Sequence, residues 1–253
     1  FAATRRARLA DRRAVRLDDP ALVAREYADD ARLRRRASAY TGAHTTVDAR
    51  APLVAAVVEA RPRHILEVGC GWGELAEWLA RETGAEVVAT DLSPRMVELA
   101  RDRGLDARVA DVQELPFEDA SFDVAVAAWM LYHAPKLDRA IAELARVLRP
   151  GGRLVAATNS RFHLIELREL VGSGPSTLRF ARETGEEQLR AHFATVRRED
   201  VDGTLEFADR SEVEEYVRAS IAMSPFVENL PPRIAEPFVA RRANSIFVAE
   251  KAA

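Results

Sequence analysis

The stretch Ile65-Leu66-Glu67-Val68-Gly69-Cys70-Gly71-Trp72-Gly73 decides the fold, because an apolar segment runs directly into a loop with glycine at every second position. A loop with so few side chains lets backbone N–H groups approach a ligand, and the following helix directs its positive end there. A second apolar segment, Val87-Val88-Ala89-Thr90, ends at Asp91, 20 residues after Gly71. At this spacing a β–α–β unit places a carboxylate on a ribose hydroxyl. The sequence therefore predicts a site for a nucleoside-containing cofactor.

Strand-like apolar segments alternate with helical segments through the middle of the chain. The predicted strands of this part cover residues 64–68, 86–90, 107–110, 122–128 and 153–158. This alternation with short loops is typical of a parallel, doubly wound sheet. The pattern changes after residue 160, where helical segments are mixed with strand segments predicted at residues 195–199, 204–207 and 245–250.

The composition is that of a globular protein, since 48% of the 253 residues are hydrophobic and 30% are charged. No apolar stretch approaches the roughly 20 residues that span a bilayer. The net charge is −3, but residues 1–50 hold 12 arginines against 7 acids, with basic runs at residues 5–8 and 32–36. No aromatic residues are interleaved there for base stacking, so a solvated helix face is favoured. The single cysteine excludes an intrachain disulfide and favours a cytoplasmic location.

Four blocks of sequence resemble the class I methyltransferases that use S-adenosylmethionine, especially the small-molecule enzymes of the menaquinone and sterol methyltransferase group. They are LEVGCGWG at residues 66–73, ATDLSPRM at 89–96, ADVQELPF at 110–117, and SFDVAV at 121–126 continuing to RVLRPGG at 146–152. The glycines follow Gly-x-Gly-x-Gly rather than the Gly-x-Gly-x-x-Gly of the pyrophosphate fingerprint, which disfavours an NAD-dependent dehydrogenase.

The resemblance implies an α/β fold: a Rossmann-like, doubly wound, seven-stranded, mostly parallel sheet with an antiparallel last strand. A helical N-terminal arm and a C-terminal lid insertion would complete a single domain. Its predicted parts are an arm or cap at 1–60, a cofactor-binding core at 61–160, an acceptor-site lid with later strands at 161–244, and the last strand at 245–253. The implied activity is methyl transfer from S-adenosylmethionine to an O, N or C atom of a small molecule, which yields S-adenosylhomocysteine.

The resemblance also assigns roles to residues. Glu67 supports the methionine portion of the cofactor, Asp91 accepts both ribose hydroxyls, and Leu92 packs on the adenine face. Asp111 and the backbone of Val112 read the adenine amino edge. The full predicted cofactor-binding set is Tyr40, Glu67, Gly69, Cys70, Gly71, Gly73, Asp91, Leu92, Met96, Asp111, Val112, Gln113, Ala128 and Trp129. For Cys70, Leu92 and Met96, packing in the core is the alternative interpretation.

Methyl transfer is a displacement at carbon, so alignment supplies much of the rate, and a base is needed where the acceptor holds a proton. His133 is the predicted base, because it follows the fourth strand at the carboxyl edge where ligands bind in open α/β sheets. A structural histidine held by a loop is the alternative. The predicted acceptor-site residues are His44, Tyr132, His133, Asn159 and His163. Apolar lid residues predict a partly apolar acceptor: Phe162, Leu164, Phe180, Phe226 and Phe238.

Two other functions stay open. One is a protein that binds S-adenosylmethionine without turnover, and the other is an RNA methyltransferase guided by the basic arm. The Asn/Asp-Pro-Pro-aromatic signature of base methylation is absent after residue 128. We expect a small-molecule partner, no nucleic acid, no membrane span, and a monomer or homodimer. No His, Cys, Asp or Glu residues have the spacing of metal ligands, so we expect no metal.

Overall fold

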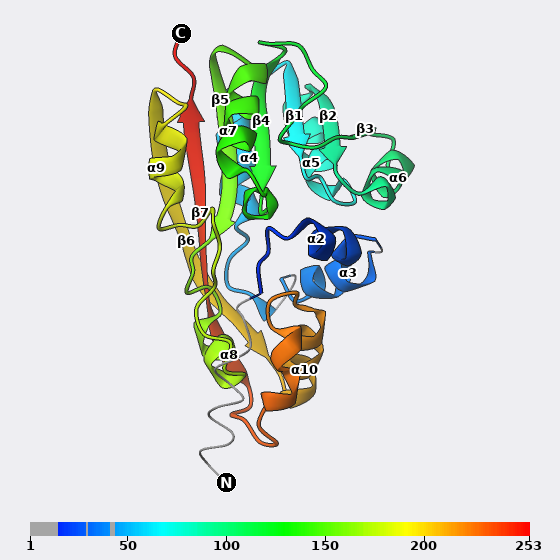
Figure 1. Cartoon of the computed structure of the whole chain (residues 1–253), viewed down its shortest axis with the longest axis vertical. Coiled ribbons are helices and arrows are strands. Elements are labelled where there is room, and N and C mark those ends of the chain that lie inside the picture. The colour runs from blue at the N-terminus through cyan, green and yellow to red at the C-terminus, as the bar shows by residue number, and fades with distance from the viewer. Residues whose placement is uncertain (1–14, 29, 41–43) are drawn as a thin grey trace.

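A computed structural model describes residues 15–28, 30–40 and 44–253, so the arginine run at residues 5–8 lies outside the described residues. One seven-stranded sheet has the order β3-β2-β1-β4-β5-β7-β6 (Figure 1). The strands are β1 (His64–Val68), β2 (Glu86–Asp91), β3 (Asp106–Val109), β4 (Phe122–Ala128), β5 (Leu148–Asn159), β6 (Thr195–Phe207) and β7 (Phe238–Glu250). β7 is antiparallel to β5 and β6, and the other pairs are parallel. The predicted Rossmann-like sheet with an antiparallel last strand is confirmed.

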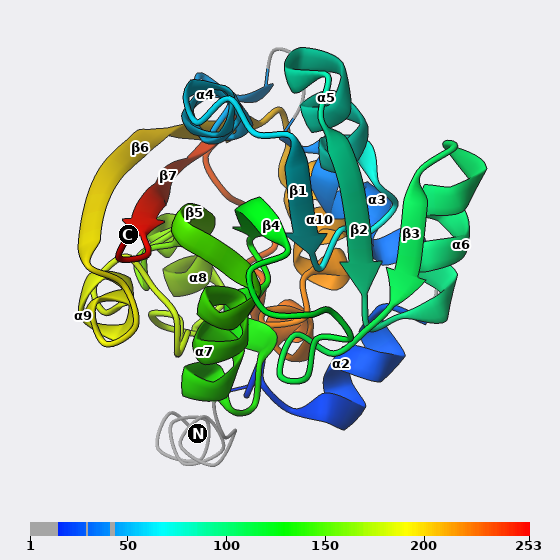
Figure 2. The ribbon, with the colours of Figure 1, turned by 90° about the horizontal axis from the view of Figure 1, so that it is seen from above.

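Helices cover both faces of the sheet, as the view from above shows (Figure 2). The helices of one face are α4 (Arg50–Glu59), α5 (Glu74–Thr83) and α6 (Pro94–Asp102), and those of the other are α7 (Leu137–Val147) and α9 (Gly185–Arg190). Along β4, Val124 and Val126 pack on the first face, while Ala125 and Ala127 pack on the second. Both sets are buried, which explains why the central strands are almost entirely apolar.

Local signals set the helix ends that frame the carboxyl edge of the sheet. Ser93 Oγ accepts a hydrogen bond from the Met96 N–H, and Pro94 is the first residue of α6. Gly84 ends α5 with φ 67°, a conformation that costs glycine little. Both signals were readable in the sequence, and α5 and α6 begin and end close to where these residues predict.

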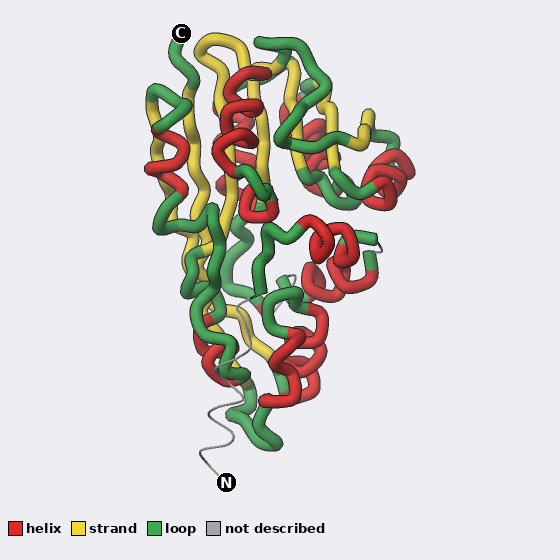
Figure 3. The backbone as a smooth tube through the Cα atoms, viewed as in Figure 1, coloured by secondary structure: helices red, strands yellow, loops and turns green. Residues whose placement is uncertain are grey.

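Beyond the carboxyl edge lie an N-terminal arm and a lid (Figure 3). The arm contains α2 (Pro20–Glu26) and α3 (Ala31–Ser38), and the lid contains α8 (Ile165–Leu170), α10 (Arg210–Ala219) and the 3₁₀ helix η3 (Ser224–Asn229). Lid residues form a hydrophobic cluster of their own, which includes Leu167, Phe207 and Val217. The two parts meet where α3 contacts α10, so the predicted helical arm and lid insertion are both present.

The late strands differ from the prediction. The segments expected at 195–199 and 204–207 form one strand, β6, and β7 begins at Phe238 instead of residue 245. Gly203, which lies between the two predicted segments, stays paired with Arg242 of β7. A Cβ atom at Gly203 would lie 2.6 Å from Val47 Cγ2, so this glycine admits the N-terminal segment against the strand.

Candidate active site

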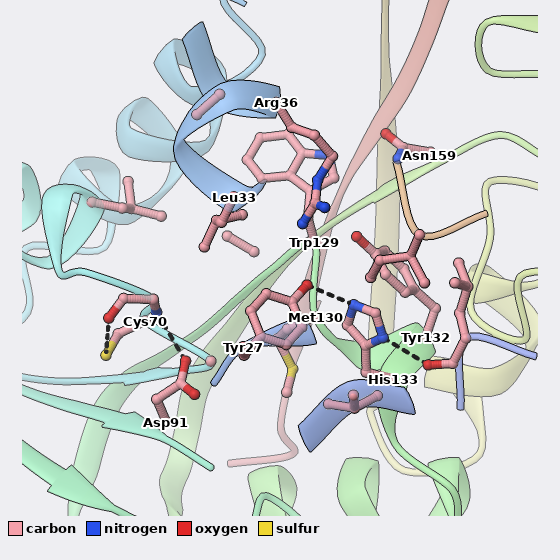
Figure 4. Close-up of a pocket in the computed structure, with 18 of the residues that line it drawn as sticks. Tyr27, Leu33, Arg36, Cys70, Asp91, Trp129, Met130, Tyr132, His133 and Asn159 are labelled. Carbon is pink, nitrogen blue, oxygen red and sulfur yellow. Dashed lines mark hydrogen bonds between the residues drawn. The ribbon is translucent and has the colours of Figure 1, made fainter. Parts of the chain in front are cut away.

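A cavity of about 790 Å³ lies between the carboxyl edge of the sheet, the arm and the lid. Its size suits a small-molecule site. Residues from all three parts line it, so segments far apart in the sequence meet there (Figure 4). The predicted site residues fall into a group at the glycine loop and a group towards the lid.

The glycine loop has backbone that favours glycine. Gly69 and Gly71 have φ values of 66° and 54° and line the cavity. A Cβ atom at Gly69 would lie 2.7 Å from Met130 Cβ, so the loop cannot carry a side chain there without moving its neighbour. A Cβ atom at Gly71 would have Leu33 Cδ2 of α3 as its nearest neighbour, at 3.7 Å. The backbone of Gly71 is therefore open to a ligand on the side that faces α3.

Gly73 does not line the cavity, so the structure does not bring this predicted cofactor contact to the site. It has φ 83°, and a Cβ atom there would lie 2.6 Å from Leu105 Cδ1. The third glycine instead permits close packing of the start of α5 against the segment that follows α6. Met96, another predicted contact, is fully buried in the core and also does not line the cavity.

Asp91 ends β2 and reaches back to the glycine loop. Its Oδ2 accepts the Gly71 N–H at 2.9 Å (Figure 4). Its Oδ1 accepts the Ser93 N–H at 2.8 Å. Burial raises the pKa of this carboxyl, while the backbone N–H groups oppose the rise. Next to it, Leu92 is 53% exposed and lines the cavity. Leu92 is therefore not a core residue, and it presents an apolar surface for a planar ring.

Glu67 is the most unusual carboxyl of the site. It is 2% exposed, and its Oε2 has no hydrogen-bond partner among the described residues. Burial, together with the nearby charge of Asp91, raises its pKa to about 8. A buried, unpartnered carboxyl is costly, so its position on the cavity wall points to a ligand that brings a cationic or hydrogen-bonding group.

The remaining residues of the glycine-loop group complete its walls. Asp111, Val112 and Gln113 line the cavity in a turn in which Asp111 Oδ1 accepts the Gln113 N–H at 2.8 Å. Cys70 is buried on the cavity wall. Burial raises the pKa of its thiol, with Glu67 and Asp91 adding to the rise. Cys70 is therefore an uncharged packing residue and not a nucleophile.

The chain leaves β4 in a strained conformation. Trp129 has φ 53°, which costs a non-glycine residue roughly 1–3 kcal/mol. Its N–H donates to the Ala157 carbonyl at 2.8 Å, which fixes the turn. Ala128 and Trp129 line the cavity as predicted, and the turn brings Met130 against Gly69.

His133, in the short helix η2 (Leu131–His133), has both ring nitrogens engaged (Figure 4). Nδ1 lies 2.7 Å from the Leu17 carbonyl oxygen, and Nε2 lies 3.0 Å from the Tyr27 hydroxyl. Because a carbonyl accepts, Nδ1 carries the proton and Tyr27 donates to Nε2. Burial lowers the pKa of His133 to about 4 and raises that of Tyr27 to about 12. Both groups are therefore uncharged near neutral pH.

His163 is also buried, and it joins the lid to the arm. Its Nδ1 accepts the Ala243 N–H at 3.1 Å, so the proton is on Nε2, which lies 3.4 Å from the Tyr40 hydroxyl. The Tyr40 hydroxyl also makes a short hydrogen bond with the Tyr216 hydroxyl. Burial first, then Arg242 and Arg168, lowers the pKa of His163 to about 3. Tyr40, His163 and Tyr216 all line the cavity.

The predicted acceptor-side residues divide into those that line the cavity and those that do not. Tyr132, His133, Asn159 and His163 line the cavity. His44 is exposed and does not line it, so the structure does not bring this predicted residue to the acceptor side. Of the five apolar lid residues, Leu164 lines the cavity, whereas Phe162, Phe180, Phe226 and Phe238 do not. Phe180 packs with Phe247 in the core of the sheet, Phe226 and Phe238 pack in the lid's own cluster, and Phe162 is exposed.

The sequence did not reveal several cavity-lining residues. They are Tyr27, Arg36, Arg168, Tyr216, Arg242 and Asn244. Arg168 and Tyr216 lie on helices with ordinary amphipathic patterns, and Arg242 lies on the part of β7 that was not predicted as strand. No local motif marks these positions, because tertiary pairing brings them to the site.

No three side chains among the described His, Cys, Asp and Glu residues converge in a way that would hold a metal. Within the described ranges, no helix is both long enough and apolar enough to cross a membrane. The glycine-loop group does fit S-adenosylmethionine. It offers an unpartnered buried carboxyl for a cationic amino-acid portion, a carboxylate for ribose and an exposed leucine for adenine.

Comparisons with known proteins agree with this geometry. Residues 66–156 match the family described as "Methyltransferase domain". Methyltransferase GfsG of Streptomyces halstedii is 42% identical over 157 residues, which are 58% of this chain and 55% of that protein. A ubiquinone biosynthesis O-methyltransferase of Xanthomonas oryzae pv. oryzae is 39% identical over 125 residues, 47% of this chain and 52% of that protein. The chain spans about half the length of these curated relatives.

Among solved structures, the YcgJ protein of Bacillus subtilis is similar with a TM-score of 0.60. It is 18% identical, and the match covers 81% of this chain and 99% of that one. At this identity the likeness establishes the fold.

Proposed function

We propose that this chain, a class I S-adenosylmethionine-dependent methyltransferase, transfers the methyl group of its cofactor to a hydroxyl oxygen of a small molecule. The observation that carries the proposal is one continuous cavity that joins the glycine-loop group to Tyr27, His133 and Asn159. A donor and an acceptor bound in the same cavity are held in the alignment that displacement requires. The printed name of the Xanthomonas relative, an O-methyltransferase, supports oxygen as the acceptor atom.

In this proposal the glycine-loop group holds the cofactor. Gly69 and Gly71 let the backbone approach its amino-acid portion, and Glu67 accepts from the cationic ammonium. Asp91 receives the ribose hydroxyls, while Leu92 and the turn at Asp111 enclose adenine. When bound, the cofactor supplies an electrophilic methyl carbon whose bond to sulfur breaks with the electron pair going to sulfur.

His133 and Tyr27 would remove the acceptor proton. As the acceptor oxygen forms its bond to the methyl carbon, its O–H becomes strongly acidic, so even a weak base suffices. The Tyr27 hydroxyl would take that proton while passing its own to His133 Nε2, to which it already donates. The Leu17 carbonyl, bonded to Nδ1–H, orients the imidazole and stabilises the imidazolium that forms.

These roles assign different parts of the chain to the methyl donor and to the acceptor. We propose that residues 61–160 hold the donor, whereas the lid at 161–244 and the arm at 1–60 enclose the acceptor. We also propose a cytoplasmic setting, as the single cysteine favours, and a monomeric or homodimeric enzyme.

A screen of hydroxylated small molecules with cofactor labelled on the methyl carbon tests the activity. We expect label in an acceptor together with stoichiometric S-adenosylhomocysteine. Tight cofactor binding without transfer to any member of a broad panel would favour the non-catalytic alternative.

With an acceptor in hand, His133→Ala tests the base. We expect turnover to fall by about 10²- to 10⁴-fold, while the affinity for S-adenosylmethionine stays within about twofold. Tyr27→Phe keeps the ring but removes the hydroxyl, and it should lower turnover in the same direction. Unchanged rates in both variants would remove this pair from the mechanism and support an acceptor that needs no base.

RNA methylation is the weaker alternative, because the arginines of the run at residues 32–36 are already paired. Arg34 pairs with Asp30, and Arg36 pairs with the buried Glu26. Arg35 pairs with Glu215 at 2.9 Å. Such pairs leave little free positive charge for phosphates, so RNA binding that weakens steeply with salt would be needed to revive this function.

A further inference from the structure

The lid side of the cavity contains arginines without acidic partners. Six arginines line the cavity. Four of them form salt bridges with carboxylates, namely Arg34, Arg36, Arg50 and Arg103. Arg168 and Arg242 have no carboxylate within salt-bridge distance among the described residues. Arg242 is buried and Arg168 is half-buried, so their missing partners need an explanation.

Arg242 lies on β7, two residues beyond the last residue of that strand paired with β5. It is 5% exposed, and its Nε has no hydrogen-bond partner within the described ranges. Its Nη1 donates to both Thr45 Oγ1 and the Val47 carbonyl, and its guanidinium lies 4.7 Å from the centre of the Tyr40 ring. Neutral groups therefore fix its position. Asp48 acts on its charge from beyond salt-bridge distance and is itself paired with Arg50.

Arg168 lies on α8 and faces the same tyrosines. Its Nε donates to the His163 carbonyl at 3.3 Å. Burial lowers its pKa, and the groups that oppose this effect are Tyr216 and Tyr40 rather than any acid. Both arginines also lower the pKa of His163, so the two positive charges lie around the same histidine.

The other polar groups at this end are mostly donors. His163 is held with its proton on Nε2, because Ala243 N–H occupies Nδ1. Tyr40 and Tyr216 contribute hydroxyls, and the Asn244 amide also lines the cavity. Buried cations without partners cost several kcal/mol each, whereas a carboxylate or phosphate placed among such donors gains charge-assisted hydrogen bonds.

We propose that the acceptor carries an anionic oxygen group, a carboxylate or a phosphate monoester, which binds between Arg168 and Arg242 beside Tyr40. This inference rests on the proposed function, since it assigns the lid side of the cavity to the acceptor. The anion anchors the far end of the acceptor, and the hydroxyl to be methylated then lies towards Trp129 and His133. A neutral molecule of the same shape would leave the two arginines unpaired, so the site selects for charge.

The test uses the full chain saturated with S-adenosylhomocysteine, so that the donor side is filled. Benzoate and phenyl phosphate are titrated in by calorimetry, with benzamide as the neutral isostere. We expect at least one of the two anions to bind at least tenfold more tightly than benzamide. A preference for one anion over the other identifies the acidic group. Equal affinity for the anions and benzamide overturns the proposal.

Arg168→Met and Arg242→Met test the residues themselves. Each should reduce the anion preference to less than about twofold and leave the affinity for S-adenosylhomocysteine unchanged. Arg241→Met is the matched control, because this neighbouring arginine of β7 is exposed and does not line the cavity. Arg168→Gln provides a second variant if the loss of Arg242 prevents folding.

Two results would contradict the assignment while leaving methyl transfer intact. If the arginine variants lose affinity for S-adenosylhomocysteine but retain the anion preference, the pair holds the cofactor's own carboxylate. If they change neither, the anion binds elsewhere. The acceptor screen with labelled cofactor is independent of all these titrations, so failure here is distinguishable from failure of the proposed activity.

Discussion

The two ends of the cavity carry ionisable groups of opposite kind. The acids Glu67 and Asp91 lie at the glycine-loop end, and Arg168 and Arg242 lie at the lid end. Among the described residues, each end contains a buried polar atom without a hydrogen-bond partner, Glu67 Oε2 or Arg242 Nε. Because an unpaired buried charge is unfavourable, these atoms mark where each ligand must bring the opposite charge.

The two ends also differ in how the chain assembles them. The acidic end comes from consecutive β–α units, in which short loops fix each residue at the carboxyl edge of a parallel sheet. The basic end comes from α8 and from β7, whose Arg168 and Arg242 are more than 70 residues apart in sequence. Motif spacing can therefore reveal the first end but not the second.

The largest expected effect concerns the acidic end. Asp91→Ala removes the ribose acceptor and also the partner of the Gly71 and Ser93 N–H groups. Charge-assisted hydrogen bonds contribute about 1.5–3 kcal/mol each, so S-adenosylmethionine should bind at least tenfold more weakly by calorimetry. Affinity for benzoate at the basic end should not change in parallel. Unchanged cofactor affinity would contradict the assignment of the acidic end.

A smaller expected effect is a pH dependence of cofactor affinity, which distinguishes the acidic end from the basic end. In the free protein the pKa of Glu67 is raised to about 8, and a bound ammonium group should lower it. Binding then releases a proton, so cofactor affinity should fall severalfold as the pH decreases from 8 to 6. Glu67→Gln should remove this dependence. A wild-type affinity that is flat over this range would show that the cation does not contact Glu67.

The smallest effect concerns stability and the basic end. His163 and His133 have pKa values lowered to about 3 and 4 by burial, below the unfolded value of about 6.5. Their contribution to stability is therefore complete above pH 6.5 and decreases as the pH falls towards 4 and 3. In this window, each histidine that stays neutral in the folded protein should lower the free energy of unfolding by about 1.4 kcal/mol for each unit by which the pH falls. This loss corresponds to a decrease of a few degrees in Tm.

The matched variants for this effect are His163→Gln and His44→Gln. His163→Gln should make the decrease in Tm between pH 7 and 5.5 shallower than in the wild type. His44→Gln changes an exposed histidine and should leave the decrease unchanged. Equal slopes in all three proteins would show that the buried histidine is not the cause.

The sequence allowed most of the core to be predicted. Ser93 with Pro94 and Gly84 set helix ends by local hydrogen bonding and backbone conformation, which depend on neighbouring residues. Asp91 and Leu92 line the cavity, whereas Gly73 and Met96 pack beside it. A motif does not distinguish a residue that lines a cavity from one that packs beneath it.

The lid was harder to predict because long-range pairing determines it. Gly203, which has the local character of a turn, pairs within β6 because β7 continues beside it. Tyr27, in the arm, reaches His133 across 106 positions of sequence. Neither contact leaves a periodic or local signal, so the acceptor side of the site requires the structure.

The β6–β7 hairpin has one further consequence. β5 pairs with β7 as far as Asn244, but β6 and β7 remain paired to Phe207 and Phe238. Residues 238–243 therefore project about 20 Å past the sheet, at about 3.3 Å per residue, and carry Arg242 with them. In evolution, the length and the charge of this end of the hairpin can change without disturbing the strands that form the cofactor site. Proteins with this fold can therefore change the acceptor that they bind while they keep the same cofactor.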